Sequence, residues 1–329
     1  MSASNPSTRE LYVKEYLKNM HEICDKNFTN IRSHDKNKLV TGIFYANEYY
    51  HALKETKCTA RLEFLIKRDA FYNGWANPKM FNQLINNTSP SGKAINSWVK
   101  KAEISPSIAL QALKEGPTLV GCGEVLGISE YLALQKNLGE KKFDFLFSSD
   151  SPFAMNICPN QPIEKTLRIM RPFQKPEDLE IGDSAYILGV PELYQSKHMN
   201  GEAQAYNVLC CENQEKPRFL AFGIDPKQGR GVTAKKITNI LLEELNKVPE
   251  TMELFTQELA GRILATYSPQ ALLQNESLRN FRLTKEQFTA MGGGRIFNQR
   301  LSMDYDKLSL LVEKSPEEGL KLMKIWTNK

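Results

Sequence analysis

The chain has 329 residues, of which 41% are hydrophobic and 25% charged, so it is long enough for one large globular domain or two ordinary ones. Its 43 basic and 38 acidic residues leave a net charge of only +5, which gives no sign of nucleic-acid or anionic-membrane binding. No apolar stretch is long enough for a membrane-spanning helix, and the polar N-terminus lacks the apolar core of a signal peptide. We therefore expect a cytoplasmic protein, or one secreted without a signal peptide, whose partners include neither nucleic acid nor membrane.

The six cysteines form no CxxC pair, so the sequence predicts neither a zinc site nor a thioredoxin-like motif. Two of them, Cys210 and Cys211, are adjacent, and on a strand their side chains would point to opposite faces. We expect all six to be reduced thiols, as is usual in a cytosolic compartment.

One helix and one or two strands are predicted before residue 70. Ser7 or Thr8 is a suitable N-cap for a helix over about 10–25, where apolar residues recur at helical spacing. Residues 40–53 are aromatic-rich and fit either a strand or a helix, whereas residues 59–66 alternate as a strand does.

Residues 70–95 resemble a loop, because they contain Asn-Gly, Asn-Pro and Ser-Pro-Ser-Gly turn signals. Trp75 and Trp98 flank this region. Each would serve either as a core anchor or as a wall of a substrate cleft, and the core role is the more usual one for tryptophan.

Two helices are predicted around the most informative stretch of the chain. The first covers 105–114, with Ser105 as its N-cap and Gly116 at its end. The next residues, GPTLVGCGEVLGISEYLAL, approach Cys122 through small side chains and then form an apolar helix that Gly139 ends. A further short helix is predicted directly after Gly139.

Cys122 is a candidate nucleophile because it begins a helix between Gly121 and Gly123. The amide groups and the dipole at a helix N-terminus stabilise an anion and lower the pKa of a thiol there, and small neighbours leave room for a substrate. The alternative is a buried core cysteine, since free cysteine is among the most buried residue types.

The middle of the chain predicts a sheet. Residues 148–180 read as a long proline-rich loop with a short strand at 163–170. Three apolar, β-favouring runs then predict an antiparallel meander over 184–190, 205–211 and 219–224.

The C-terminal part reads as helical, without further strands. The Gly-Gly-Gly-Arg sequence at 292–295 predicts a turn rather than a phosphate-binding loop, because no strand-to-helix context surrounds it. The predicted helices cover 233–247, 251–267, 270–276, 284–291 and 304–326.

His198 is the candidate base among four histidines, because it lies in the predicted loop between two strands of the meander. A cysteine on a helix N-terminus, then a histidine at a sheet edge, then a polar residue on the next strand is the chain order of papain-like enzymes. The imidazole would move the thiol proton, and Asn207 would orient it, with Glu202 and Asp225 as alternatives. The oxyanion would be held by the Cys122 backbone N–H and one further donor.

Residues 104–147, ISPSIALQALKEGPTLVGCGEVLGISEYLALQKNLGEKKFDFLF, resemble the core of the bacterial spore-coat protein-glutamine γ-glutamyltransferases. These are small transglutaminases with an NlpC/P60-like fold related to papain. The resemblance resumes at IGDSAYILGVPEL and continues through AYNVLCC and AFGIDP into the helix at Ile237, so it covers about residues 100–247.

The resemblance implies an α+β fold, in which a nucleophile helix packs on an antiparallel sheet, with added N- and C-terminal helices. It also implies that Cys122 would release ammonia from a glutamine of a protein substrate and form a thioester. A lysine or another amine would accept the acyl group, and water in its place would give deamidation. No cofactor and no metal is implied.

Two departures from the family concern the base. The family's two glutamates fall on Tyr206 and Gly121 here, and its third-strand histidine falls on Phe222. We therefore expect His198, with Asn207 or Glu202, to replace the family's base. Tyr206 is expected to line the substrate cleft together with the two tryptophans.

The predicted domains are an N-terminal helical extension over 1–60, a transglutaminase-like catalytic core over 61–247 and a C-terminal helical region over 248–329. Three other functions remain open: a glutamine deamidase, a cysteine peptidase or amidase on the same fold, and an inactive interaction protein. The polar N-terminus and the appended helices would suit a bacterial effector.

Overall fold

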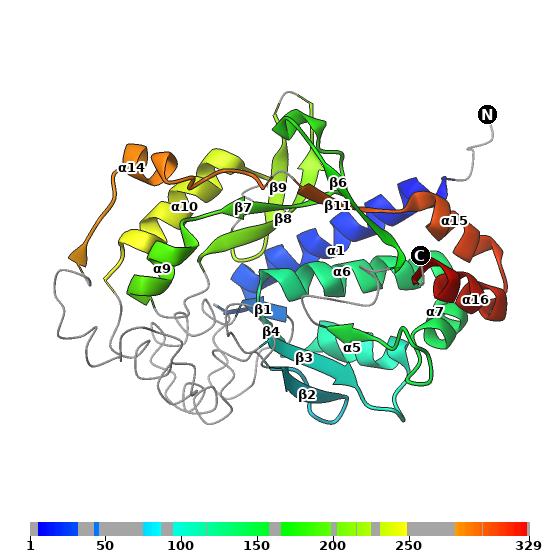
Figure 1. The fold of residues 1–329 in the computed structure, drawn as a ribbon. Helices are drawn as coiled ribbons and strands as arrows, with labels where there is room; N and C mark the ends of the chain where they lie inside the picture. Colours follow the sequence, from blue (N-terminus) through cyan, green and yellow to red (C-terminus); the bar gives the residue numbers. More distant parts are fainter. Residues whose placement is uncertain are drawn as a thin grey trace.

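The fold is that of a computed structural model (Figure 1), which describes residues 6–31, 43–45, 75–86, 95–116, 118–157, 166–198, 203–214, 216–224, 231–248, 280–297 and 299–327. It is a mixed structure of helices and mainly antiparallel sheets, as expected for the α+β class. Among these residues, no helix is both long and apolar enough to span a bilayer. The predicted elements at 59–66, 251–267 and 270–276 lie outside them.

The main sheet has six strands in the order β10-β9-β8-β7-β11-β6, and every pairing is antiparallel. The predicted meander forms its centre and is confirmed. The strands are β6 (Arg168–Pro172), β7 (Ser184–Leu188), β8 (Ala205–Glu212), β9 (Arg218–Ala221), β10 (Val232–Thr233) and β11 (Gln299–Met303).

The alternation of side chains along β8 divides the interior into two cores. Leu209 belongs to a core with the helices of one face, whereas Val208 and Cys210 belong to a second core on the other face. Cys211 packs against the first core, so the two adjacent cysteines point to opposite faces as predicted.

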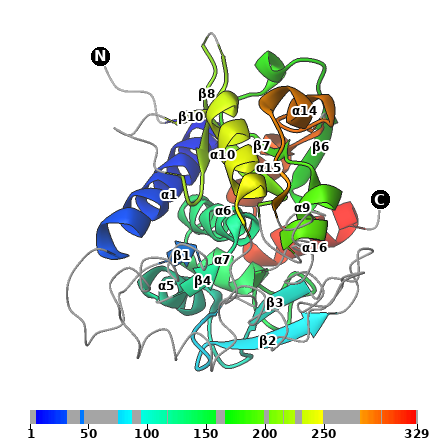
Figure 2. The same ribbon diagram turned by 90° about the vertical axis from the view of Figure 1, so that its left-hand side faces the viewer.

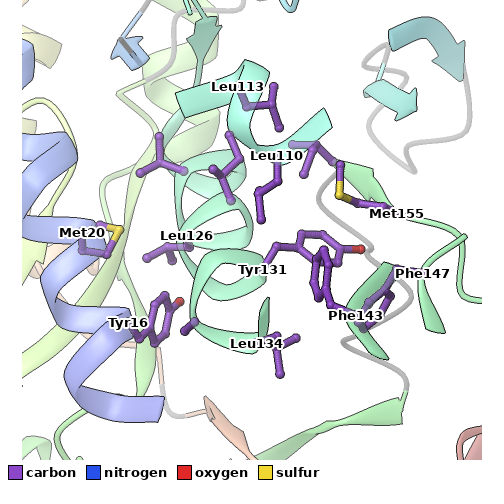
Figure 3. Close-up of a cluster of buried hydrophobic side chains, with 14 of the residues drawn as sticks. Tyr16, Met20, Leu110, Leu113, Leu126, Tyr131, Leu134, Phe143, Phe147 and Met155 are labelled. Atoms are coloured by element: carbon purple, nitrogen blue, oxygen red, sulfur yellow. The ribbon is translucent and has the colours of Figure 1, made fainter. Parts of the chain in front are cut away.

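The first face carries α1 (Thr8–Ile31) and α6 (Cys122–Leu138), which run side by side in Figure 1. Figure 3 shows Tyr16 and Met20 of α1 reaching toward Leu126 of α6. On another side of α6, the Tyr131 ring lies edge-on to the Phe147 ring, with 5.5 Å between centroids.

A buried ion pair between Arg168 and Glu130 holds α6 in position against the neighbouring elements. Arg168 of β6 donates from Nε to Glu130 Oε1 at 2.8 Å, and the Tyr12 hydroxyl of α1 donates to the same oxygen at 3.1 Å. Because a buried carboxylate is costly without partners, these contacts hold α1, α6 and β6 in one relative position.

The second face carries α10 (Ala234–Asn246), with α9 (Pro191–His198) and α14 (Lys285–Ala290) beside it. Thr233 caps α10 through a bond from Lys236 N–H to its side chain. Figure 2 shows α10 and α14 at the top of the molecule and β2 and β3 at the bottom, with α6 between them.

Two smaller sheets lie below α6. One pairs β2 (Phe81–Asn86), β3 (Ile95–Lys100) and β5 (Asn156–Ile157), and the other pairs β1 (Ile43–Tyr45) in parallel with β4 (Thr118–Val120). Helix α5 (Pro106–Glu115) precedes β4. The remaining elements are α7 (Glu140–Leu146), α15 (Tyr305–Glu313), α16 (Pro316–Thr327) and a 3-10 turn at Pro176–Asp178, between β6 and β7.

Caps explain why the helices around α6 were predictable. Ser105 accepts a bond from Ile108 N–H at the start of α5, and Gly116 ends it with φ 61°. Gly139 ends α6 with φ 76°, a conformation that favours glycine. Ser7, rather than Thr8, caps α1 through a reciprocal pair of bonds with Glu10.

Three predictions were wrong. Residues 70–95 were predicted as a loop but contain β2. Its adjacent polar residues Asn82 and Gln83 are both exposed, so the sequence there lacks the alternation of polar and apolar residues typical of a strand. The predicted loop after β7 contains α9. The C-terminal part contributes β11, which lies between β7 and β6 through contacts that are remote in sequence. The 304–326 prediction corresponds to two helices, α15 and α16, separated where Pro316 begins the second.

Both predicted domain boundaries are crossed by contacts. Helix α1 packs on α6, and β11 is a member of the main sheet. The division at 60 and 247 stays a prediction about the chain's organisation.

Candidate active site

Cys122 is the first residue of α6 and follows directly on a short connection from β4. Strand β4 is held on both sides, by β1 and by a two-bond bridge between Leu119 and Trp75. Val125 and Ile128, within the first two turns of α6, are fully buried. The start of α6 is thus fixed, while Cys122 itself is only partly buried.

Asn207 of β8 contacts the thiol directly. Its Nδ2 lies 3.4 Å from Cys122 Sγ and donates toward the sulfur. A Cβ on Gly123 would lie 3.4 Å from the same nitrogen, an ordinary van der Waals distance, so Gly123 lies directly beside the amide. Asn207 was expected to orient an imidazole, and the structure instead brings its amide to the sulfur.

Glu124, which sequence reasoning missed, occupies the third position of α6. Its carboxyl reaches back to the Gly121 N–H, as half of a capping box, and its Oε2 lies 3.0 Å from where a Gly121 Cβ would stand. Burial raises the pKa of this carboxyl, and hydrogen bonds from the backbone N–H groups of Glu124 and Gly121 oppose the rise. A glutamate three residues after an N-cap was the available sequence signal.

Tyr186 of β7 lies directly opposite Asn207 in the sheet register, so both side chains are on the α6 face. Burial, with a smaller contribution from negative charge at Cys122, raises the pKa of Tyr186 to about 12. Its phenol therefore stays protonated and able to donate at neutral pH. The antiparallel pairing of two correctly predicted strands was the signal that could have found it.

His198 lies on the other side of the sheet, at the last residue of α9. Its Nε2 is 3.3 Å from the Leu245 carbonyl at the end of α10, and its ring stacks on Tyr194 with centroids 4.6 Å apart. Since a carbonyl only accepts, this nitrogen carries the proton. Lys197 donates to the same carbonyl at 2.9 Å. The structure therefore gives His198 a place in the α9–α10 contact rather than beside Cys122, because α9 turns it toward α10.

The predicted cleft residues are dispersed. Trp98 and Tyr206 are buried, in the first and second core respectively, and Tyr206 faces away from Asn207 because neighbours on a strand alternate. Trp75 is partly buried beside β4. Glu202 and Asp225 lie outside the described residues.

No group of three or more His, Cys, Asp or Glu side chains with metal-ligating geometry occurs in the described part of the chain. The cysteines in that part of the chain are Cys24, Cys122, Cys210 and Cys211. At the candidate site the Asn207 amide contacts the Cys122 thiol, the Tyr186 phenol lies on the same face of the sheet, and the Glu124 carboxyl lies two residues further along α6.

Comparisons with known proteins give similarity at the level of the fold. No protein-family model and no curated protein matches the chain. The fold is similar to a transglutaminase from Geobacillus stearothermophilus, solved without its C-terminal extension, with a TM-score of 0.46 and 10% sequence identity. The similarity covers 94% of this chain and 97% of that one.

Proposed function

We propose that the chain is a transglutaminase-like thiol acyltransferase with a papain-related, NlpC/P60-like catalytic core. Cys122 attacks the side-chain carboxamide of a protein glutamine, and an amine takes the acyl group. The observation that carries the proposal is the partly exposed Cys122 at the start of a buried helix, with Asn207 Nδ2 at 3.4 Å from its sulfur.

The first step forms one bond and breaks one. The thiolate sulfur bonds to the carboxamide carbon, and the carbonyl oxygen becomes an oxyanion. The Asn207 amide and the Tyr186 phenol are the side-chain donors on this face that would stabilise that charge. The carbon–nitrogen bond then breaks, ammonia leaves with an added proton, and a thioester remains.

The second step releases the acyl group and regenerates the free enzyme. The nitrogen of a lysine or another primary amine bonds to the thioester carbon and loses a proton, and the Cys122 sulfur leaves as thiolate. Water as the acceptor gives glutamate instead of an isopeptide.

Glu124 is our candidate for the proton transfers. As a carboxylate it would accept the thiol proton and return it to the leaving ammonia. Its raised pKa brings the carboxyl closer to neutrality, where one group serves well as both acid and base.

The test incubates the full chain with a glutamine-containing peptide and a fluorescent primary amine, and follows ammonia release and amine incorporation. Intact-protein mass spectrometry of the quenched reaction should show the peptide on Cys122 with the loss of one ammonia. Cys122→Ser should show none of these signals and keep its thermal unfolding midpoint. Wild-type protein that reacts with no glutamine donor would contradict the proposal.

The same reaction separates the other functions. Glutamate without amine incorporation identifies a deamidase. Peptide-bond cleavage identifies a peptidase. Unmodified peptide together with a Cys122 thiol inert toward iodoacetamide identifies an inactive protein.

A further inference from the structure

An exposed row of side chains leads away from Cys122 across the main sheet. Tyr186 follows Asn207 on the next strand, and the segment after it along the sheet is 294–297, whose Phe297 N–H donates to Tyr186 O at 2.8 Å. Ile296 forms a bridge with Ile187.

The bridge fixes which face each neighbour occupies. Ile187 is fully buried in the second core and Ile296 packs against that core. Because successive residues alternate, Tyr186 and Phe297 both lie on the opposite, Cys122 face. Arg295 lies two residues from Phe297 and therefore on that same face.

These side chains are open to solvent. Tyr186 is 36% and Phe297 39% exposed, and Arg295 is also exposed. Two large aromatic residues exposed side by side on the face of the sheet that carries Cys122 form an apolar surface of the kind that marks ligand-binding sites.

We propose that Tyr186, Phe297 and Arg295 form the subsite for the polypeptide that carries the reactive glutamine. The subsite binds an apolar side chain near that glutamine on the two rings, and Arg295 favours an acidic residue beside it. This inference rests on the proposed acyl transfer at Cys122.

The geometry sets the spacing of the preferred sequence. Asn207, Tyr186 and Phe297 lie on neighbouring strands, and two strand spacings amount to about 10 Å. An extended peptide advances about 3.3 Å per residue, so the apolar side chain is expected about three residues from the glutamine.

The experiment compares three glutamine donors with full-length protein: a capped minimal glutamine, a peptide with leucine three residues from the glutamine, and the same peptide with serine there. Both directions from the glutamine are sampled. Phe297→Ala should lower kcat/KM for the leucine peptide about tenfold and leave that for the minimal donor unchanged. The matched control, Met170→Ala, removes another exposed apolar side chain, on the edge strand β6, and should change neither.

Charge is tested separately. Wild-type protein should prefer a peptide with aspartate beside the leucine over one with lysine, and Arg295→Glu should reverse that order. An equal loss on all donors in Phe297→Ala, or no loss on any, would overturn the subsite.

If no donor reacts, the acyl-transfer proposal fails and the subsite is still decided by binding. The leucine and serine peptides, labelled with a fluorophore, are titrated against Cys122→Ser by anisotropy. Tighter binding of the leucine peptide that Phe297→Ala abolishes supports the surface, whereas equal binding of both peptides overturns it.

Discussion

The two faces of the main sheet hold polar side chains under opposite conditions. On the α6 face, Cys122, Asn207 and Tyr186 are all partly open to solvent. On the α10 face, Lys197 and His198 are almost fully buried. Chain order alone would have joined His198 to Cys122, and the sheet separates them.

The α10 face shows what a buried polar cluster does in a fold. The last carbonyls of a helix lack intrahelical donors and lie at its negative end. Leu245 O accepts from both Lys197 Nζ and His198 Nε2, and Lys197 also donates to the Phe281 carbonyl at 2.9 Å. These donors stabilise the end of α10. This structural role accounts for the buried Lys197 and His198, and no catalytic role is needed.

The contact between Asn207 and Cys122 on the α6 face has no comparable structural role. A hydrogen bond from a side-chain amide to a weak sulfur acceptor contributes little to stability, whereas the Glu124 carboxyl two residues away also caps the start of α6. Groups that are poorly used for folding and open to solvent are the ones available for chemistry. Mutations on the two faces should therefore separate activity from stability.

Among the side chains that surround Cys122, replacement of Asn207 by alanine should have the largest effect on activity. Loss of its amide should lower kcat about 10²- to 10³-fold, as for removal of one oxyanion donor. The free energy of unfolding should change by no more than about 1 kcal/mol, because only a weak bond to a thiol is lost. Single-turnover acylation and urea unfolding measure the two. A large loss of stability with normal acylation would remove Asn207 from the site.

Replacement of Glu124 by glutamine should come next, and its signature is the pH profile. The carboxylate acts as base only after it loses its proton, so the wild-type rate should rise with pH through the raised pKa of Glu124. Glu124→Gln should abolish that rise and lower the plateau about 10²-fold. If the rate of Glu124→Gln still rises with pH as in wild type, the rise belongs to another titrating group.

Glu124 also predicts a pH dependence of stability. Because its pKa is higher in the folded than in the unfolded chain, the folded state binds more protons between the two values. Its contribution to the free energy of unfolding is present below the unfolded pKa and is lost as the pH rises through the folded one. Urea unfolding at several pH values should show this loss in wild type and not in Glu124→Gln.

The helices around Cys122 could be predicted because their ends are specified by residues close in sequence. Strands that pair with residues far away in sequence could not be predicted in this way. Ser105, Gly116 and Gly139 specify helix ends through their own side chain or backbone, so the limits of α5 and α6 follow from sequence. Strand β11 joins the sheet through partners more than a hundred residues away, at Ser184 and at Arg168–Pro172, and its own residues give no such signal.

The position of His198 could not be predicted for a related reason. The spacing from Cys122 to His198 says nothing about which face of the sheet the histidine reaches. That was decided by α9, which the sequence did not predict and which brings its last two residues to α10. Tyr206 was expected to line the cleft, but it points into the second core. Adjacent side chains on a strand face opposite sides, and its neighbour Asn207 is the one that faces the thiol.

Substitution on the α10 face should affect stability and spare activity. His198→Ala removes one bond to Leu245 O and the stacking on Tyr194, and should lower the free energy of unfolding by about 1–2 kcal/mol. The rate of acylation of Cys122 should stay within about twofold of the wild-type rate. The loss of one hydrogen bond that stabilises the transition state would lower the rate by more than this. A drop of two or more orders of magnitude in acylation, with normal folding, would restore His198 as the base.

The smallest expected effect comes from Gly121→Ala, which separates the position of the Glu124 carboxyl from its presence. Gly121 has φ −90° and ψ −179°, so its backbone accepts alanine, but the new Cβ would lie 3.0 Å from Glu124 Oε2 and push the carboxyl outward. Once displaced, the carboxyl is solvated and its pKa falls toward the ordinary value, because burial is the main cause of the rise.

The acid limb of the rate profile should therefore move to lower pH, and the plateau should fall about two- to tenfold, the size of one hydrogen bond. Gly123→Ala is the matched control, since its Cβ meets Asn207 Nδ2 at an ordinary 3.4 Å and leaves Glu124 in place. An acid limb that moves equally in both variants would show that the helix start, and not the carboxyl, sets the pH dependence.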